Sequence, residues 1–280
     1  MKKINRRSFL AAAGLTAAAL ALTACGGSSS STASSTASSA AASSEAASSS
    51  AAAELTTVEA GKLTMATNAA FPPYEMTTDT GAFEGIDVDT AQAIAEKLGL
   101  ELQIDDMDFD AALLSVQQGK ADIVMAGVTV TDERKAVMDF SDSYATGIQS
   151  IIVPEGSDIA TPDDLAGKTI GTQRGTTGYI YCSDDFGDDA VVAYDDGLTA
   201  VQALNNGQVD AVVIDNAPAK EFVAANPGLV ILETSYAEED YAIGMAKGNT
   251  ALEDAVNAAL EELKADGTLQ SIVDKYITAE

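Results

Sequence analysis

The stretch that decides the fold begins with the apolar run Leu63-Thr64-Met65-Ala66-Thr67 and continues with Asp87-Val88-Asp89-Thr90-Ala91-Gln92-Ala93-Ile94-Ala95-Glu96-Lys97-Leu98. The first run has the length and apolar character of a buried strand. In the second, apolar residues recur every three or four positions and Gly99 follows as a stop signal, which predicts an amphipathic helix. A strand at 102–104, a helix from its predicted cap Asp110 to Gly119 and a strand at 123–126 follow. This βαβαβ order predicts a mainly parallel sheet covered by helices.

The same alternation restarts after residue 149. The pattern predicts strands at 150–153, 168–172, 191–193, 211–214, 230–232 and 241–245, and helices at 176–182, 198–205, 217–225, 252–265 and 269–277. Polar, ligand-type motifs follow strands in both units, and ligands of open α/β sheets lie at the carboxyl ends of strands. We therefore expect an α/β protein with two lobes that face a cleft.

The N-terminal residues have the pattern of an export signal. Four basic residues precede the apolar run Phe9–Leu22, and Leu22-Thr23-Ala24-Cys25 resembles a bacterial lipoprotein box. We expect a signal peptide at 1–25, a lipid on Cys25, a flexible Ser/Ala-rich tether at 26–53, and an extracytoplasmic protein anchored to the bacterial cell membrane. Asn5–Leu10 also resembles a twin-arginine signal, although two basic residues are common in general export signals, so the export route stays open.

Composition excludes several classes of function. The chain has 43 acidic and 15 basic side chains, and its net charge of −28 disfavours binding to nucleic acid or anionic lipid. It has no histidine, which removes the usual Ser-His-Asp and Cys-His catalytic sets and the commonest transition-metal ligand. We expect no metal, no cofactor and no catalysis. If Cys25 is lipidated, Cys182 has no disulfide partner within the chain.

Beyond the export segment the chain has only two arginines, Arg134 and Arg174. Arg134 ends the run Ala126-Gly127-Val128-Thr129-Val130-Thr131-Asp132-Glu133-Arg134, in which Gly127 allows close backbone approach and Thr129 adds a hydroxyl. A guanidinium holds a carboxylate through two parallel hydrogen bonds. The alternative is a surface arginine paired with an acidic neighbour, Glu133 or Asp139.

Three further motifs complete a predicted anion and cation site. Gly175-Thr176-Thr177-Gly178 can cradle an anion at a helix start, or Thr can simply cap that helix. Asp215 ends a strand and can accept bonds from an ammonium group, or can cap the next helix. Phe71, Tyr74 and Phe109 can enclose a side chain, or can belong to the core. Together these groups match a free α-amino acid.

The ordered set of motifs resembles the family 3 extracellular solute-binding proteins of polar amino-acid ABC transporters. The matching stretches are Ala66–Glu75, Gly85–Asp89, Met107–Asp110, Ala126–Arg134, Asp139–Ser141, Gly175–Gly178 and Val209–Asp215. The resemblance implies a two-lobed, periplasmic-binding-protein-like fold of type II, with two crossing strands as its hinge. It implies lobe 1 at 60–147 and 243–280, and lobe 2 at 148–242, with crossings near 145–149 and 238–243.

The resemblance also assigns roles to residues. Arg134 would hold the α-carboxylate with Thr129, Thr176 and Thr177, and Asp215 with the Gly127 carbonyl would hold the α-amino group. Side-chain contacts would come from Asn68, Phe71, Phe109 and Gln173, while the role of Arg174 stays open.

The function implied is capture of a polar or basic L-amino acid, such as glutamine, arginine or lysine, for delivery to the permease subunits of an ABC importer. Asn68 stands where family members that prefer basic side chains often carry Asp, which argues against a strictly lysine-type ligand. Cystine-like ligands are a further alternative. The alternatives are an amino-acid sensor module and a dehydratase of the same fold. We expect a monomer.

Overall fold

The computed structural model describes residues 55–277. The predicted signal peptide at 1–25, the tether at 26–53 and the lipidation site Cys25 lie outside these residues. Two mixed α/β units with separate sheets make up the described part, which confirms the predicted fold class.

The first unit, called lobe 1 below, is built on a five-stranded sheet with the order β5-β1-β6-β14-β7. Strands β1 and β5 pair in parallel, as do β1 and β6, whereas β14 pairs antiparallel with both β6 and β7. The strands are β1 (Lys62–Thr67), β5 (Glu101–Asp106), β6 (Ile123–Val124), β7 (Met138–Phe140) and β14 (Gly244–Ala246).

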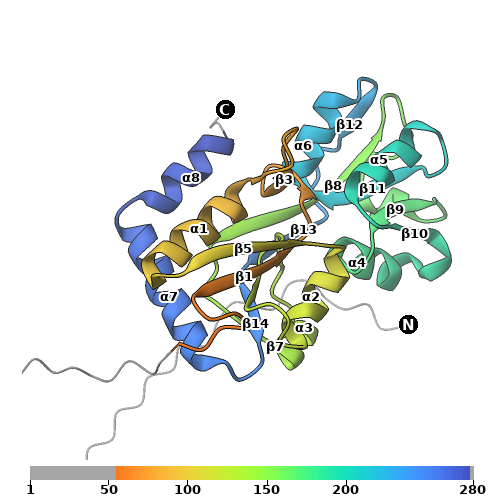
Figure 1. The fold of residues 1–280 in the computed structure, drawn as a ribbon. Helices are drawn as coiled ribbons and strands as arrows, with labels where there is room; N and C mark the ends of the chain where they lie inside the picture. Colours follow the sequence, from red (N-terminus) through yellow and green to blue (C-terminus); the bar gives the residue numbers. More distant parts are fainter. Residues whose placement is uncertain (1–54, 278–280) are drawn as a thin grey trace, which may run out of the picture. The chain divides into compact units, whose positions relative to one another are not determined.

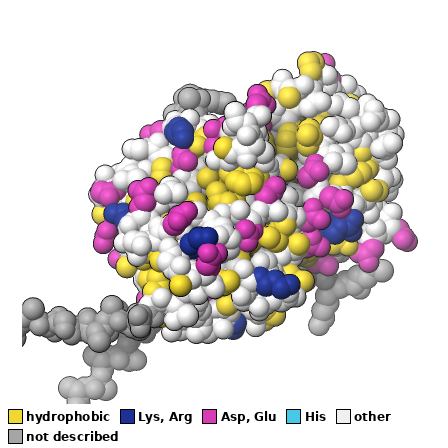
Figure 2. Space-filling model, in the orientation of Figure 1, with side chains coloured by type: hydrophobic (Ala, Val, Ile, Leu, Met, Phe, Trp, Pro, Cys, Tyr) yellow, Lys and Arg dark blue, Asp and Glu magenta, His cyan; other side chains and the backbone are white. Residues whose placement is uncertain are grey.

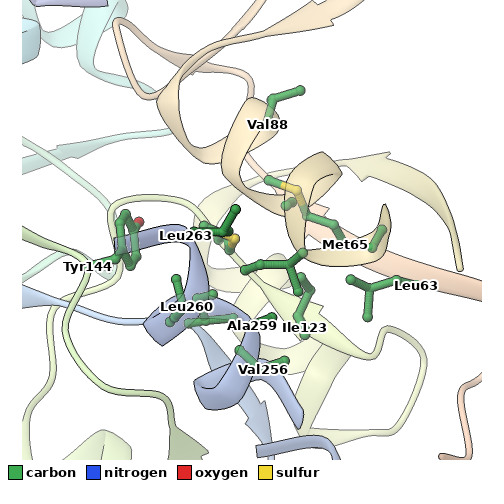
Figure 3. Packing of buried hydrophobic residues seen from close by; sticks show 14 of the residues in the cluster. Leu63, Met65, Val88, Ile123, Tyr144, Val256, Ala259, Leu260 and Leu263 are labelled. Atoms are coloured by element: carbon green, nitrogen blue, oxygen red, sulfur yellow. The ribbon is translucent and has the colours of Figure 1, made fainter. Parts of the chain in front are cut away.

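Alternation along the strands of lobe 1 gives its sheet two apolar faces. Leu63 and Met65 of β1 pack on one face with α1 (Ile86–Leu98), α7 (Thr250–Ala265) and α8 (Thr268–Tyr276), whereas Ala66 packs on the other with α2 (Phe109–Gln117). Figure 1 shows α1 and α7 side by side, and Figure 3 shows α7 residues such as Val256 and Leu260 against Ile123. Because each face needs its own cover, the sheet is enclosed by helices.

The second unit, called lobe 2 below, is built on a six-stranded sheet with the order β10-β9-β11-β8-β12, and β13 also pairs with β8. Strand β9 pairs in parallel with β10 and β11, and β8 is antiparallel to β11, β12 and β13. The strands are β8 (Ala145–Pro154), β9 (Ile170–Gln173), β10 (Val191–Tyr194), β11 (Ala211–Asp215), β12 (Leu229–Ile231) and β13 (Ala237–Tyr241).

Successive side chains along β11 point to opposite faces of the sheet, so the core of lobe 2 has two hydrophobic clusters, one on each face. Val212 and Ile214 of β11 pack with α5 (Gly197–Asn205) and α6 (Asn216–Ala225), whereas Val213 packs on the opposite face with Cys182 of α4 (Thr177–Phe186). Two short 3-10 helices, η1 (Pro162–Leu165) and η2 (Asp188–Ala190), connect elements of this lobe.

Strands β8 and β13 connect the two lobes. They pair antiparallel from Ala145↔Tyr241 to Gln149↔Ala237. At the Tyr241 end of this pairing, the N–H of Val130 donates to the carbonyl of Asp240 at 3.0 Å. This bond attaches the backbone of lobe 1 to the C-terminal end of β13. The pairing agrees with two crossing strands, while the lobe boundaries at 147/148 and 242/243 stay predictions.

Two sequence predictions are wrong in detail. The strand predicted at 241–245 is split, because β13 ends at Tyr241 in one sheet and β14 begins at Gly244 in the other. The residue at the N-cap of α2 is Asp108 and not Asp110, which lies in the first helical turn. Neither β7 nor a small antiparallel sheet of β2 (Ala70–Phe71), β3 (Glu75–Thr77) and β4 (Phe83–Glu84) was predicted from the sequence. A short helix, α3 (Asp132–Val137), carries Arg134.

Among the charged side chains on the surface visible in Figure 2, acidic ones outnumber basic ones. Acidic side chains are scattered over the face shown in Figure 2, with few lysines and arginines among them. This agrees with the composition of the whole chain, which has 43 acidic and 15 basic side chains. Within residues 55–277, no helix combines the length and the apolar character needed to cross a membrane.

Gly147 of β8 offers a test of how tightly the crossing strands pack. A Cβ atom at this position would lie 2.5 Å from Cζ of Tyr241 and 2.7 Å from Oδ2 of Asp215. Tyr241 is 1% exposed and packs edge-on against Tyr74 at 5.4 Å, so its ring would have to shift to admit a methyl group. We expect Gly147→Ala to lower the free energy of unfolding by about 1–3 kcal/mol, measured by urea denaturation.

The control is Thr146→Ala, which shortens the neighbouring exposed side chain and is expected to change stability by no more than ~0.5 kcal/mol. A Gly147→Ala protein as stable as the control would contradict the close approach of Tyr241 to β8.

Candidate functional site

One cavity collects the residues predicted from the sequence. All ten of the predicted ligand-binding residues line it. The residues they share it with are Glu75, Ala126, Gln149, Val213, Ile214 and Tyr241. Their roles in binding stay predictions, but the sequence motifs do come together in space.

Strand direction explains why these distant segments meet. Asn68 follows β1 and Gly127 follows β6, and the two strands are parallel, so both residues leave the same edge of the sheet of lobe 1. Gln173 and Asp215 end the parallel strands β9 and β11 of lobe 2. The cavity therefore lies at the carboxyl ends of strands from both sheets.

Arg134, in α3, is buried with 8% of its surface exposed. Its guanidinium donates to the carbonyl of Thr129 at 2.7 Å and to the carbonyl of Gly175 at 3.1 Å, and it lies 5.4 Å from the centre of the Phe109 ring. No acidic side chain of the described chain lies within ion-pair distance of it. Burial lowers the pKa of Arg134, although a guanidinium keeps its charge in proteins.

The alternative reading of Arg134 as a surface arginine is therefore wrong. Its predicted surface partner Asp139 instead pairs with Lys247 at 2.6 Å. Carbonyl dipoles and an aromatic face solvate the guanidinium, and Glu239 acts on it electrostatically without forming an ion pair, so N–H groups of Arg134 remain available for an anion.

The N-terminus of α4 lies on the same cavity. Thr177 is its first helical residue and is 2% exposed, and first-turn N–H groups have no acceptor within the helix. The Thr176 hydroxyl, however, accepts from Tyr179 N–H at 3.3 Å and donates to the Gln173 carbonyl at 2.8 Å. Thr176 thus acts as the helix cap, and its hydroxyl proton is already used.

The hydroxyl of Thr129 is also committed. It donates to Oε2 of Glu239 at 3.0 Å, and that oxygen also accepts from the side-chain amide of Gln149 at 3.0 Å. Glu239 lies on β13 and is 6% exposed. Thr129 can therefore offer an anion its backbone N–H, while its side chain is tied to the crossing strand.

Asp215 is a buried carboxylate at the end of β11. Its oxygens accept from the N–H groups of Ile148 at 2.8 Å and Ala217 at 3.1 Å, so the capping alternative also holds. Tyr241 adds a third donor, which leaves about one of four acceptor positions for a further donor. Burial raises the pKa of Asp215 to about 6. An ammonium group in the cavity would stabilise its charged form.

Asn68 and Gln173 contact each other across the cavity. The amide of Gln173 donates to Oδ1 of Asn68 at 2.8 Å, and the amide of Asn68 donates to the carbonyl of Met107 at 3.0 Å. This bond joins the two lobes directly. A ligand that reaches the amides must replace it with bonds of its own.

The aromatic residues divide between cavity and core. Phe71 lines the cavity, where a Cβ atom on Gly127 (φ +55°) would lie 2.9 Å from its ring. Tyr74 is 4% exposed and packs edge-on against Tyr241 at 5.4 Å, so for Tyr74 the core alternative holds. Gly127 is required here because both the ring and the backbone angle disfavour a side chain.

Glu75 is the most informative residue that sequence reasoning missed. It pairs directly with Phe71 across β2 and β3, so both side chains are on one face of the small sheet, and both line the cavity. Glu75 is fully buried and neither of its oxygens accepts a hydrogen bond. Burial and the neighbouring Asp87 raise the pKa of Glu75 well above its usual range.

Gln149, Tyr241 and Glu239 were missed as well. All three lie on the crossing strands β8 and β13. Glu239 accepts from both Thr129 and Gln149, and Tyr241 donates to Asp215. Their sequence contains no ligand-type motif, so only the pairing of β8 with β13 could have identified them.

Arg174 and Cys182 do not line the cavity. The side chain of Arg174 is 53% exposed and lies 3.6 Å from Asp195. Cys182 is fully buried, which raises the pKa of its thiol to about 12. Across the residues that the structure describes, no group of three or more carboxylates or cysteines could hold a metal ion.

Comparison with known proteins supports the resemblance seen in the sequence. Residues 63–279 match the family described as bacterial extracellular solute-binding proteins, family 3. The L-cystine-binding protein TcyJ of Escherichia coli (strain K12) is 34% identical over 226 residues, which cover 79% of this chain and 85% of that protein.

Two solved structures share the fold of this chain. An ancestral arginine-binding protein bound to arginine is 42% identical with a TM-score of 0.74, covering 78% of this chain and 98% of the other. An ancestral arginine-binding protein bound to glutamine is 41% identical with a TM-score of 0.75, covering 78% and 99%. The predicted family and fold are thereby confirmed. The chain belongs to the bacterial extracellular solute-binding proteins, family 3.

Proposed function

We propose that this protein captures a basic L-amino acid of the arginine or lysine type between its lobes and delivers it to an ABC importer. The observation that carries this proposal is the charge pattern of the cavity. It contains one buried guanidinium without an acidic partner, and two buried carboxyl groups, Asp215 and Glu75.

Arg134 is suited to the α-carboxylate. Its remaining N–H groups can form two parallel bonds with a carboxylate, and the N-terminus of α4 at Thr177 adds unpaired N–H groups and a favourable dipole. An amino acid held in this way contacts both lobes, because Arg134 belongs to lobe 1 and α4 to lobe 2. Binding would therefore favour the closed arrangement.

Asp215 is suited to the α-amino group, with the carbonyl of Gly127 as a second acceptor. Both charges of an amino-acid zwitterion would then have an opposite charge beside them, because Arg134 would pair with the carboxylate and Asp215 with the ammonium group. Glu75 is then left over, buried and without a hydrogen-bond donor. A cationic side chain would supply the missing donor and charge.

A neutral polar side chain such as glutamine is the second candidate. The bond between Asn68 and Gln173 shows that two amides can meet at this end of the cavity, and a third amide could replace either. Relatives support both candidates, because one ancestral arginine-binding protein is bound to arginine and another to glutamine.

Transport is favoured over the other functions considered. The family is described as solute-binding, and the relatives in the comparison are named for what they bind, so we propose that this chain is not an enzyme. A dehydratase of this fold would need an acid or base that remains unpaired once the ligand is bound, whereas Arg134, Asp215 and Glu75 all gain partners. A sensor module would bind the same ligand without a permease.

We also propose that the protein is a monomer tethered by residues 26–53 to a lipid on Cys25, on the outer side of the cell membrane. The basic and apolar N-terminal pattern supports this part of the proposal, and the extracellular family agrees with it.

Thermal unfolding with each of the 20 amino acids tests the ligand class. We expect arginine or lysine to raise the melting temperature most, since a ligand at 100 times its dissociation constant stabilises a protein by about 2.7 kcal/mol. Differential scanning fluorimetry measures the shift. If no amino acid shifts the transition, the proposed function is wrong.

Arg134→Ala tests the carboxylate clamp. We expect the dissociation constant for the preferred amino acid to rise at least ~30-fold, because the ligand carboxylate would be buried without its partner. Calorimetry measures the loss. The matched control is Arg174→Ala, which removes the exposed arginine and should leave affinity unchanged. Equal affinity of the two variants would refute the assignment of Arg134.

Cys25→Ser tests the lipid anchor. We expect the substitution to move the protein from the membrane fraction into the medium or periplasm, because a protein without its lipid has no anchor. Fractionation and immunoblotting measure this, with Cys182→Ser as the control that should stay membrane-bound. A Cys25→Ser protein that remains in the membrane fraction would refute the anchor.

A further inference from the structure

A pair of buried carboxyl groups lies where the cavity meets the core of lobe 1. Glu75 lines the cavity, and Asp87 of α1 is its hydrogen-bonding neighbour and is also fully buried. Asp87 already accepts from Gly127 N–H at 3.0 Å and from the Tyr144 hydroxyl at 2.7 Å. Its carboxylate is therefore well stabilised, whereas the oxygens of Glu75 accept no bond.

A shared proton accounts for this arrangement. Two carboxylates cannot donate to each other, but a protonated Glu75 can donate to Asp87. Burial together with Asp87 raises the pKa of Glu75 well above its usual range, and burial raises the pKa of Asp87 to about 6. Without a cation in the cavity, Glu75 is therefore the member of the pair that holds a shared proton more readily.

The side chains that shift the pKa of the pair are acidic or phenolic, and Arg134 and Asp215 line the same cavity as Glu75. Glu75 is influenced by Asp87 from α1 and by Asp106 from β5, and it acts in turn on Tyr74 and Tyr144. None of these acidic and phenolic groups carries positive charge. The chain has no histidine, so no side chain with an ordinary pKa near neutrality competes with the pair.

We propose that binding of a cationic side chain displaces the proton that Glu75 shares with Asp87, so that this protein releases a proton for each arginine or lysine it captures at the Glu75 end of the cavity. The inference rests on the proposed function and adds a coupling to it. The proton leaves the Glu75 carboxyl group for solvent, the guanidinium keeps its charge, and the Glu75 carboxylate that remains accepts its N–H groups.

The direction of the pH dependence follows from this exchange. A guanidinium beside Glu75 stabilises the carboxylate, so the pKa of Glu75 is lower in the complex than in the empty cavity. Between those two values binding releases a proton, and affinity for arginine rises with pH by up to about tenfold per unit. Above the pKa of the empty cavity Glu75 is already ionised, and affinity becomes independent of pH.

Asp215 must be separated from Glu75 in any measurement. Burial raises its pKa to about 6, and the α-ammonium group of every amino acid would lower it again. Glutamine has the same α-ammonium group but no cationic side chain. Protons released with arginine in excess of those released with glutamine therefore report on Glu75.

Calorimetry of the full-length protein measures this excess directly. Arginine and glutamine are each titrated at one pH near 7 in phosphate and in Tris, whose ionisation enthalpies differ, and the difference in binding heat gives the number of protons released. We expect more protons to be released with arginine than with glutamine, and the dissociation constant of arginine to fall with rising pH more steeply than that of glutamine.

Glu75→Gln assigns the proton. In this variant the excess should fall to zero and the affinity for arginine should drop at least tenfold, with circular dichroism to verify folding. The matched control is Glu84→Gln, the same change at an exposed position on β4 of the same small sheet, which should keep the excess.

The outcomes separate the inference from the proposed function. Binding heat with equal proton release for arginine and glutamine would overturn the inference and leave amino-acid binding intact. Binding of glutamine but not of arginine or lysine would also overturn it. If none of the amino acids produced any binding heat, the proposed function itself would be wrong. The comparison of the two ligands on the wild-type protein decides the matter even if Glu75→Gln does not fold.

Discussion

A guanidinium removed from water must be solvated by the protein, and the way this chain solvates Arg134 determines the geometry of its cavity. Two carbonyls and one ring surround the group, and one of the carbonyls, that of Gly175, comes from the other lobe. These neutral partners satisfy hydrogen bonds but leave the charge uncompensated. The lobes therefore meet around a centre that still requires an anion, and the other residues of the cavity are arranged around that requirement.

The crossing strands connect this centre to the rest of the site. Glu239 on β13 holds both Thr129 of lobe 1 and Gln149 of β8, and Tyr241 lies against Gly127, Gly147 and Asp215. A change in the angle between the lobes would alter these contacts together. The residues predicted to hold the amino acid are thus fixed by the same strands that would act as the hinge, which relates binding to closure without any additional element.

The sequence predicted the lobes and the cavity well where the signal was local. Strand ends, the αL glycine Gly99 after α1 and the Thr176 cap of α4 all follow from neighbouring residues. Prediction from the sequence failed where a strand is defined by pairing with another strand that is distant along the chain. Nothing local separates β13 from β14, because Ala242 and Ile243 are apolar and as buried as Tyr241 at the end of β13 and Met245 in β14. Glu75 was missed because the strand that carries it has three residues and is defined only by its partners β2 and β4.

The order of strands in the two sheets has a consequence for how the polypeptide acquires its structure during synthesis and export. All six strands of lobe 2 come from one continuous stretch, Ala145–Tyr241. In lobe 1, β14 is inserted between β6 and β7, which precede it by about 100 residues in the chain. Strands β1, β5, β6 and β7 are therefore synthesised before β14, and their sheet lacks its fourth strand until Gly244–Ala246 have been made. The middle of the chain can complete its own sheet first, and the N-terminal half must wait for the C-terminal residues to close it.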